Sequence, residues 1–529
     1  MMKFYSVILA AVSSLLVGLA QGAESQQYIR FEGLLTEDRL GVAVGTLGDV
    51  NSDGYADILV GARYADVGAL TDSGSVSVFS GANGAELIHL NGEGAGDWFG
   101  VSVAGIGDIN GDGVPDFIVG AQFAKRGNGQ QTGAAYVYSG ANGAQLYRLF
   151  GDASDGRFGV SVAGGRDING DGIPDFVVGA YTAGAAYIYS GANGGLIAKL
   201  TGTSGTWYGF TVAMLADVNG DGKGEIVVTA PQDGAGSVRV YSGATRALLY
   251  TLKGEKTGDW FGFAAADGGD LNGDQKSELL IGAREASPSG HTNAGSVYVY
   301  EGKNGTLLRR LDGTNDRDAF GTSVAAVGDM NRDGVNDIVV GARFALNSSN
   351  QPTGAALVYS GSDGSQITKV NGELTQDWFG GSVAAVGDIN GDGWLEWLVG
   401  AAGSDPGGRS NAGQAYVFGL KHFDLALTSL TVPRSARLGD TITVSYTAVN
   451  HGEAATSNTY VLSINGIRKA SASGTLAFMA SRSSSFSYTL RSGDFSGGRS
   501  MVCISAAGDG VTDGYSTDNA KCVQITQTF

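Results

Sequence analysis

Nine-residue acidic segments recur seven times along the chain, the first being Asp49-Val-Asn-Ser-Asp-Gly-Tyr-Ala-Asp57. Each segment places side-chain oxygens at positions 1, 3, 5 and 9, with a glycine at position 6 in six of the seven copies. The glycine permits a sharp turn, and position 7 can offer its backbone carbonyl whatever its side chain. Because Ca²⁺ prefers about six to eight oxygen ligands, the spacing predicts one calcium site per segment.

The predicted ligands occupy the same five positions of every segment, which gives up to seven Ca²⁺ ions. They are Asp49, Asn51, Asp53, Tyr55 and Asp57; Asp108, Asn110, Asp112, Val114 and Asp116; Asp167, Asn169, Asp171, Ile173 and Asp175; Asp217, Asn219, Asp221, Lys223 and Glu225; Asp270, Asn272, Asp274, Lys276 and Glu278; Asp329, Asn331, Asp333, Val335 and Asp337; Asp388, Asn390, Asp392, Trp394 and Glu396. The fifth segment matches the pattern least well, because Gln275 replaces the turn glycine and Lys276 follows it. The fourth is next, since Lys223 stands at the carbonyl position.

Two other kinds of loop share part of this pattern. An EF-hand loop ends with a bidentate Glu at position 12, whereas position 12 is Val or Ile in every copy here. Asp, Asn and Gly also form metal-free turns through local side-chain to backbone bonds. Such turns do not require four oxygen donors at fixed spacing, and three carboxylates in one loop would repel one another without a cation. The metal-free alternative stays open for single segments.

The charge of the chain agrees with a calcium requirement. The 34 Lys and Arg against 52 Asp and Glu give a formal net charge of −18, which argues against a nucleic-acid partner. The seven segments contain 21 of the 52 acidic residues. Seven bound Ca²⁺ ions would bring the charge of −19 expected without Lys3 to −5.

The segments recur at intervals of 59, 59, 50, 53, 59 and 59 residues, so each belongs to a whole supersecondary unit. The second unit illustrates the pattern of four strands, at residues 100–105, 116–120, 135–138 and 145–149. Asn-Gly turns such as Ser80-Gly-Ala-Asn-Gly84 join the third strand to the fourth. Four-stranded units at this period predict propeller blades, with a solenoid as the alternative.

The ends of the repeat region predict how the ring closes. Ile29-Arg-Phe-Glu-Gly33 matches the fourth-strand sequence Ile88-His-Leu-Asn-Gly92, whereas the seventh unit has no fourth strand after Gln414-Ala-Tyr-Val-Phe-Gly419. The N-terminal strand is therefore expected to complete blade seven, which removes the exposed sheet edges. The fold class predicted for residues 24–419 is an all-β, seven-bladed β-propeller with strand-swapped closure.

The motifs of these units resemble FG-GAP repeats, the blades of integrin alpha-subunit propellers and of many bacterial surface proteins, over residues 28 to 419. The FG half stands at Phe99-Gly100, Phe158-Gly159, Phe261-Gly262, Phe320-Gly321 and Phe379-Gly380, with Leu40-Gly41 and Tyr208-Gly209 as variants. The GAP half stands at Gly61-Ala62, Gly120-Ala121, Gly179-Ala180, Gly282-Ala283, Gly341-Ala342 and Gly400-Ala401, with Thr229-Ala230-Pro231 departing from it. The resemblance implies that the acidic segments are the nine-residue calcium loops of such blades, between the first and second strands.

The N-terminus predicts export. Residues 1–23 combine Lys3, an apolar run from Val7 to Leu19 and the small residues Ala20, Gly22 and Ala23, as a signal peptide does. The alternative, a membrane anchor, would need about 18 to 20 apolar residues. Since no later stretch is long enough either, we expect no transmembrane segment. The predicted location is secreted or at the cell surface, periplasmic or extracellular in a bacterium.

Residues 420–529 change character and predict a second domain. Alternating runs at 423–432, 441–449, 459–464, 484–490, 501–504 and 522–525 indicate about seven short strands, hence an immunoglobulin-like β-sandwich. The segments 424–432, 439–446 and 450–452 resemble bacterial cell-adhesion-related (CARDB-like) sandwich domains. Export would favour a disulfide between Cys503 and Cys522, with two buried free thiols as the alternative. The expected role of this module is a spacer or stalk.

Strand alternation places the partner face opposite the calcium loops. The second-to-third loops lie there, and several are long and polar, as at 122–132, 284–293 and 343–353. The tryptophans Trp98, Trp207, Trp260 and Trp378 reach the same face, either to stack on a ligand or to pack between blades.

The function expected from the sequence is that of a monomeric extracellular adhesion or ligand-binding protein, with a protein or glycan as its partner. No enzyme is expected, because the four His residues lack metal-ligand spacing and no Gly-x-Ser-x-Gly nucleophile elbow occurs. The alternatives are a structural envelope or matrix component and a secreted hydrolase on a propeller scaffold.

Overall fold

The computed structural model describes residues 25–420, 425–450, 455–465, 467–476, 481–496, 499–508 and 520–527. The predicted signal peptide, residues 1–23, lies outside the described residues. The chain separates into two compact units, with the division between Gly419 and Leu420. Among the described residues, no helix has both the length and the apolar character that crossing a bilayer would require.

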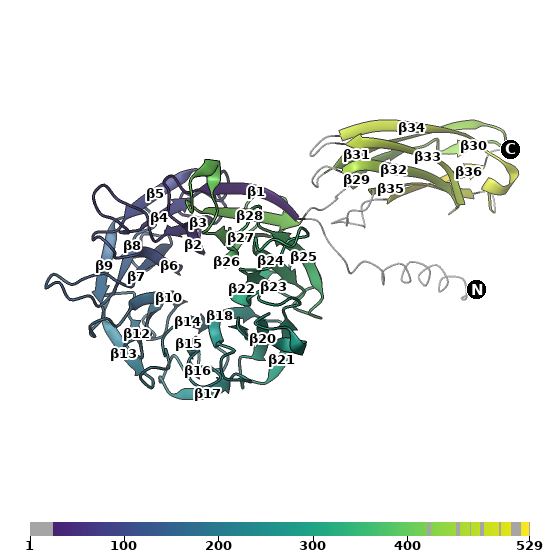
Figure 1. The fold of residues 1–529 in the computed structure, drawn as a ribbon. Helices are drawn as coiled ribbons and strands as arrows, with labels where there is room; N and C mark the ends of the chain where they lie inside the picture. Colours follow the sequence, from purple (N-terminus) through teal and green to yellow (C-terminus); the bar gives the residue numbers. More distant parts are fainter. Residues whose placement is uncertain are drawn as a thin grey trace. The chain divides into compact units, whose positions relative to one another are not determined.

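The first unit is a ring of seven four-stranded antiparallel sheets around a central opening (Figure 1). Its blades are, in order, β2 (Leu40–Leu47), β3 (Asp57–Ala62), β4 (Ser75–Phe79) and β5 (Glu86–Asn91); β6 (Phe99–Gly107), β7 (Asp116–Ala121), β8 (Ala134–Tyr138) and β9 (Gln145–Phe150); β10 (Phe158–Arg166), β11 (Asp175–Ala180), β12 (Ala185–Tyr189) and β13 (Leu196–Thr201); β14 (Val212–Leu215), β15 (Glu225–Ala230), β16 (Ser237–Tyr241) and β17 (Leu248–Lys253); β18 (Phe261–Gly269), β19 (Glu278–Ala283), β20 (Ser296–Glu301) and β21 (Leu307–Asp312); β22 (Phe320–Gly328), β23 (Asp337–Ala342), β24 (Ala355–Tyr359) and β25 (Gln366–Asn371); and β26 (Phe379–Gly387), β27 (Glu396–Ala401) and β28 (Gln414–Leu420) with β1 (Ser25–Glu32). The seven-bladed propeller predicted from the repeats is confirmed.

Blade seven is closed by the two ends of the unit. β1 pairs with β28, so the order of its sheet is β1-β28-β27-β26, and Figure 1 shows the purple β1 beside the green β28. Next to this pair, Gly33 N–H donates to Gly413 O and Leu40 N–H donates to Ala412 O, both at 2.9 Å. The predicted strand-swapped closure is therefore confirmed.

Neighbouring blades touch through the two halves of the repeated motif. The motif phenylalanines Phe99, Phe158, Phe261, Phe320 and Phe379 are at most 2% exposed. A Cβ on Gly120 would lie 1.9 Å from Gly159 O of the next blade, so a side chain cannot fit between them. The same contact closes the ring, where a Cβ on Gly400 would lie 2.0 Å from Gly41 O. The recurring glycines are thus explained by close approach of backbone between blades.

The second unit consists of two sheets and matches the immunoglobulin-like sandwich predicted for it. One sheet has the order β29-β31-β34 and the other β30-β36-β35-β32-β33. The strands are β29 (Leu425–Thr431), β30 (Ser435–Ala436), β31 (Thr441–Asn450), β32 (Ala455–Ile464), β33 (Ile467–Leu476), β34 (Ser481–Thr489), β35 (Arg499–Gly508) and β36 (Ala520–Gln527). Buried side chains of both sheets, among them Val444, Tyr446, Leu462 and Val502, form one core.

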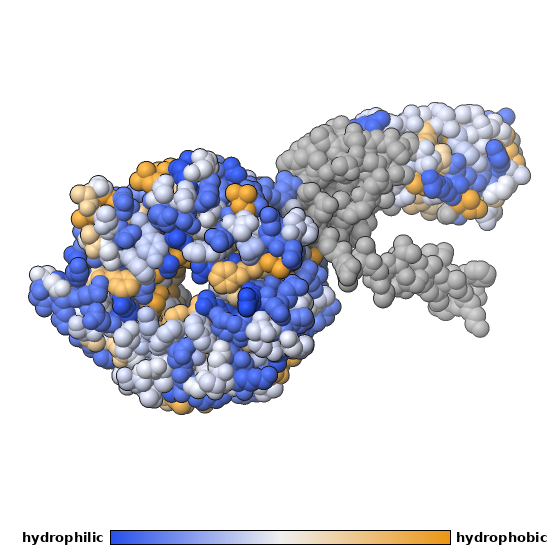
Figure 2. Space-filling view, viewed as in Figure 1, coloured by the Kyte–Doolittle hydropathy of each residue, from blue (hydrophilic) through white to orange (hydrophobic). Residues whose placement is uncertain are grey.

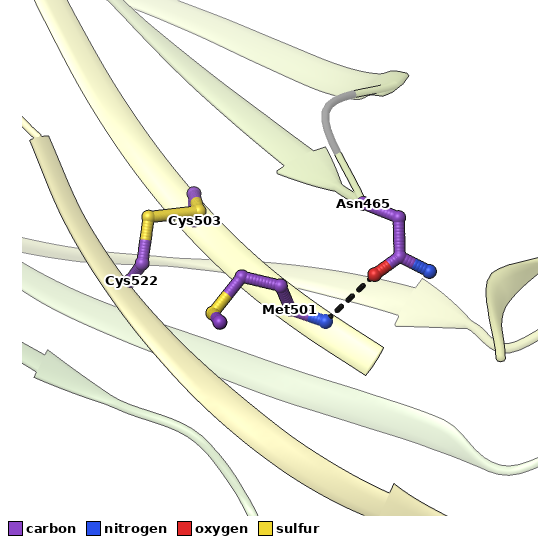
Figure 3. The surroundings of a disulfide bond; sticks show 4 residues. All are labelled: Asn465, Met501, Cys503 and Cys522. Carbon is purple, nitrogen blue, oxygen red and sulfur yellow. Dashed lines mark hydrogen bonds between the residues drawn. A yellow bond between two sulfur atoms is a disulfide. The ribbon is translucent and has the colours of Figure 1, made fainter. Parts of the chain in front are cut away.

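Cys503 and Cys522 form the predicted disulfide (Figure 3). The two residues are directly opposite each other on the neighbouring strands β35 and β36, with their Cα atoms 4.1 Å apart. The bond therefore joins two strands of one sheet and does not cross the core. Near it, Asn465 takes a left-handed φ of 48° after β32, and its side-chain oxygen accepts a hydrogen bond from Met501 N–H at 2.8 Å (Figure 3).

Candidate metal centres

The seven acidic segments lie between the first and second strands of the blades and share one hydrogen-bonded framework. In each, the N–H of position 6 donates to the position 1 carboxylate at 2.8 to 3.1 Å. The N–H of position 7 donates to the position 5 carboxylate at 2.8 to 3.0 Å. Loop five follows this pattern because Gln275 takes the left-handed φ of 65° that glycine supplies in the other loops. Gln275 in place of glycine therefore leaves the backbone hydrogen bonds of this loop the same as in the other loops.

The carboxylate at position 9 is fully buried in all seven loops. It accepts the N–H of position 2 at 2.5 to 2.9 Å, which ties the start of the loop to the second strand. Burial raises the pKa of Glu225, Glu278 and Asp337 to about 7. A buried carboxylate is costly to ionise unless a positive charge compensates it, so these positions favour a bound cation.

Blade four brings its carboxylates closest together. Oxygens of Asp217, Asp221 and Glu225 all lie within 4.8 Å of one another, and this is the one such three-residue group in the described part of the chain. Glu225 Oε1 is buried and has no hydrogen-bond partner. All the donors are oxygens, the ligands that Ca²⁺ prefers, and one oxygen of the buried Glu225 carboxylate still lacks a partner. The residues of this loop therefore fit a calcium ion.

In other loops an amide group partners the buried carboxylate. The position 3 Asn Nδ2 lies 2.9 to 3.4 Å from the position 9 carboxylate in blades two, three, five and seven. In blade four the corresponding Asn219 Nδ2 donates to Asp221 at 2.9 Å. Since the two ends of an Asn amide differ only in the assignment of O and N, the same side chain can present its oxygen to a cation.

The lysines at position 7 point away from their own loops, which the sequence pattern did not indicate. Lys223 Nζ of blade four donates to Asp167 Oδ2 of blade three at 2.9 Å. Lys276 Nζ of blade five donates to the carbonyl of Asp217 in blade four at 3.0 Å. Each lysine therefore connects its own loop to the loop of the preceding blade, and Lys223 pairs there with a predicted calcium ligand of blade three.

The turns between third and fourth strands pack on the acidic loops. Ser80 Oγ donates to Asp53 Oδ2 at 3.1 Å, and Gly81 N–H donates to Asp57 Oδ1 at 3.1 Å. Equivalent bonds from the glycine recur in blades two, three and six. The acidic loops and these turns thus form one face of the propeller, as strand alternation requires.

The tryptophans before the Phe-Gly pairs are half-buried between blades. Trp98 makes edge contacts with Tyr64 of blade one and Phe123 of blade two, with ring centroids 4.9 and 4.2 Å apart. Trp207 contacts Trp260 of the next blade with ring centroids 5.6 Å apart, and it stacks on Phe210 of its own blade at 5.5 Å. The contacts favour packing between blades as the main role of these side chains.

Comparison with known proteins gives matches along the propeller. A family model described as FG-GAP repeat matches residues 40–79, 99–138 and 379–418, and one described as FG-GAP-like repeat matches residues 167–228 and 270–340. The chain is 32% identical to integrin alpha-5 of Xenopus laevis over 185 residues, and 30% identical to integrin alpha-PS3 of Drosophila melanogaster over 197 residues. These matches cover 32% and 34% of this chain, and 17% of each relative.

A solved structure also matches the chain, a CARDB domain from Pyrococcus furiosus in complex with di-metal ions. It is 14% identical, with 20% of this chain and 90% of that chain covered and a TM-score of 0.18, too low to support an argument. The segments matched by the family models lie in all seven blades of the propeller. This chain carries FG-GAP repeats, and they form its seven-bladed propeller.

Proposed function

We propose that the protein is a secreted calcium-binding propeller that acts as an extracellular adhesion or ligand-binding protein. In this proposal residues 1–23 direct export, the acidic loops hold up to seven Ca²⁺ ions, and the opposite face binds a protein or glycan. The mature protein works as a monomer, with the sandwich at residues 420–529 as a spacer. The disulfide is in keeping with an oxidising compartment outside the cytosol.

One observation carries the metal part of the proposal. All seven loops repeat the same oxygen-rich framework around a fully buried carboxylate. In blade four the buried Glu225 Oε1 has no hydrogen-bond partner, and a cation bound between the three carboxylates would supply one. The ligand-binding part is supported by the integrin alpha relatives, of which the chain spans 17% of the length. A rigid ring with variable loops on one face suits recognition.

Calcium titration of the full chain by calorimetry, with native mass spectrometry to count the ions, tests the metal part. We expect several Ca²⁺ ions per chain and one fewer in Glu225→Gln, which keeps the shape of the side chain and removes its charge. Gln145→Glu, on the exposed start of β9, is a control that should leave the count unchanged. A wild-type protein without bound Ca²⁺ would overturn the proposal.

A pull-down from surface extracts and a glycan array, both with the calcium-loaded protein, test the ligand-binding part. A saturable partner is the expected result. Recovery of the protein only as part of an insoluble envelope fraction, without such a partner, would favour a structural component instead.

A further inference from the structure

Three arginines of blades one and six line one cavity of the propeller. Arg39 precedes β2, while Arg63 and Arg343 directly follow β3 and β23. Together with Trp378 and Phe263 they line a cavity of about 170 Å³, to which blades one, five, six and seven contribute. Figure 2 shows the central opening of the ring, with strongly hydrophilic and hydrophobic residues at its rim. We call the cavity between Arg39, Arg63 and Arg343 the arginine pocket.

Aromatic rings hold the guanidinium groups of the arginine pocket in place. The Cζ atoms of Arg39 and Arg343 lie 4.4 and 4.0 Å from the centroid of the Trp378 ring. Arg63 lies 4.8 Å from the ring of Tyr64 and 5.1 Å from that of Trp98. Stacking uses the flat faces of the guanidinium groups and leaves their N–H edges free to donate hydrogen bonds. The pocket therefore presents ordered cationic donors.

These half-buried arginines lack the acidic partners that desolvated cations normally have. Within the residues that the structure describes, Arg63 and Arg343 form no ion pair, and Arg39 reaches only the exposed Glu37 at 3.3 Å. The Nε atoms of all three are buried without a hydrogen-bond partner. Burial and the nearby Arg284, Arg63 and Arg39 lower the pKa of Arg343 to about 10. Desolvated charges without a partner are costly. This chain nevertheless keeps three arginines together here without buried acidic partners, although it has 52 acidic residues.

We propose that the arginine pocket binds a carboxylate that an acidic side chain of a peptide ligand inserts into it. A carboxylate matches the fork of a guanidinium group and would supply the negative charge that these arginines lack. The cavity has room for one such side chain, but the surroundings do not suit a polyanion. The exposed Glu37 and Asp66 lie in the same loops as Arg39 and Arg63, and the whole chain carries a net charge of −18. A ligand with one buried carboxylate avoids the repulsion that an acidic polysaccharide would meet.

This inference rests on the proposed ligand-binding function only for the source of the carboxylate. Binding by the pocket can be measured with a blocked peptide, acetyl-Gly-Asp-Gly-amide, added to the full chain and followed by calorimetry and tryptophan fluorescence. We expect saturable binding at millimolar peptide, and about tenfold or greater weakening when the peptide carries Asn in place of Asp.

Variants of the chain assign the binding to the arginine pocket. Arg343→Gln and Arg63→Gln should each weaken binding of the Asp peptide about tenfold or more. Arg343→Lys keeps the charge but not the fork, so it should recover only part of the affinity. The matched control is Arg148→Gln, because Arg148 lies on β9 and pairs with the exposed Glu93 away from the pocket. Its affinity for the peptide should equal that of the wild type.

Several results would overturn the inference. These are equal binding of the Asp and Asn peptides, undiminished binding by both glutamine variants, or no saturable binding by the wild type. Tighter, arginine-dependent binding of heparin or polyuronate would assign the pocket to an acidic glycan and overturn the peptide ligand. Melting of each variant with calcium and with EDTA shows whether it folds. It also separates the two proposals. A calcium-dependent melt without peptide binding would support the calcium sites and contradict carboxylate binding by the arginine pocket.

Discussion

The propeller and the sandwich of this chain stabilise β-sheets in different ways. The propeller repeats one small interface between neighbouring blades and joins its two ends through β1 and β28. The sandwich buries a single core between two unequal sheets and adds a disulfide within one of them. A repeated unit distributes its stability over many equivalent contacts, whereas a single core concentrates it. Perturbations that act on one kind of contact should therefore separate the two units.

Removal of β1 should have the largest effect. Deleting residues 25–33 takes away Phe31, which is 4% exposed and stacks on Phe79 at 4.3 Å, and leaves β28 as an open edge. Loss of the phenylalanine alone costs about 3 to 5 kcal/mol, so the cooperative melting of the propeller should disappear. The sandwich should still melt as in the intact chain, as calorimetry of the deletion variant can show.

A rearranged chain is the control for this deletion. Residues 25–33 are placed after Gly419 through a Ser-Gly-Ala-Asn-Gly turn like that at residues 80–84. It should restore the melting transition, because blade seven then has the hairpin of the other blades. A deletion variant that melts like the wild type would show that the closure is dispensable.

Calcium removal should have the next largest effect and act on the propeller alone. A ligand at 100 times its dissociation constant contributes about 2.7 kcal/mol per site, and several sites share the unit. Excess EDTA should therefore lower the melting temperature of the propeller substantially. Mg²⁺ should restore it poorly, since it is smaller and requires octahedral geometry. An unchanged melting temperature in EDTA would show that calcium does not stabilise the propeller.

Loss of the disulfide should act on the sandwich alone. Cys503 and Cys522 are separated by 19 residues, and a loop of this length corresponds to about 3 kcal/mol of stabilisation. The double variant Cys503→Ser, Cys522→Ser should lower the melting temperature of the sandwich and leave that of the propeller. A shift in both transitions would mean that the two units unfold together.

A pair of buried aspartates should distinguish the units by pH. Burial raises the pKa of Asp377 in the propeller to about 6. Its ionisation therefore destabilises the folded state, and this cost is complete above about pH 6 and declines as the pH falls from there toward the ordinary pKa of 3.8. Asp377→Asn should gain stability relative to the wild type between pH 4.5 and 7.5, by about 2 kcal/mol.

Asp494 of the sandwich is the opposite case. Burial acts to raise its pKa, but the hydrogen bond from Lys469 at 2.7 Å and those of its other partners outweigh burial and lower it. Its stabilising effect is present above the ordinary pKa of 3.8 and is lost as the pH falls through the lowered value. Asp494→Asn should therefore be destabilising at pH 7 and approach the wild type in strong acid. Urea melts of the wild type and both variants from strong acid to pH 7.5 provide the test, and parallel pH profiles of the two variants would contradict it.

The propeller was more predictable from sequence than the sandwich because each blade repeats the evidence. Seven acidic loops and five Phe-Gly pairs predicted the blade boundaries. The fourth-strand sequence at residues 29–33 predicted the closure of blade seven by the N-terminal strand. β33 was missed, since Ile467-Arg-Lys-Ala-Ser-Ala-Ser-Gly-Thr-Leu476 shows little apolar alternation and pairs with β32 at the edge of its sheet. A single copy of a polar edge strand carries little signal of its own.

The sequence also did not predict the directions of side chains or the contacts between distant blades. The sequence places Lys223 at a ligand position, but not its amine beside Asp167 of the preceding blade. Arg39 and Arg343 are 304 residues apart, yet both stack on Trp378. Only the curvature of the ring brings them together, and no local pattern encodes that curvature at a given residue.

The pairing of β1 with β28 also dictates the order in which the chain can assemble. Gly33 and Gly413, which bond next to this pair, are 380 residues apart, so ribosomes release β1 long before its partner. Blades one to six can form from local hairpins while blade seven must wait, which makes closure a late and slow step. Until then β1 and the nascent blade seven are open to strands of another copy. At high concentration, refolding should therefore yield some dimers that have exchanged β1, with each ring closed by the strand of the other chain.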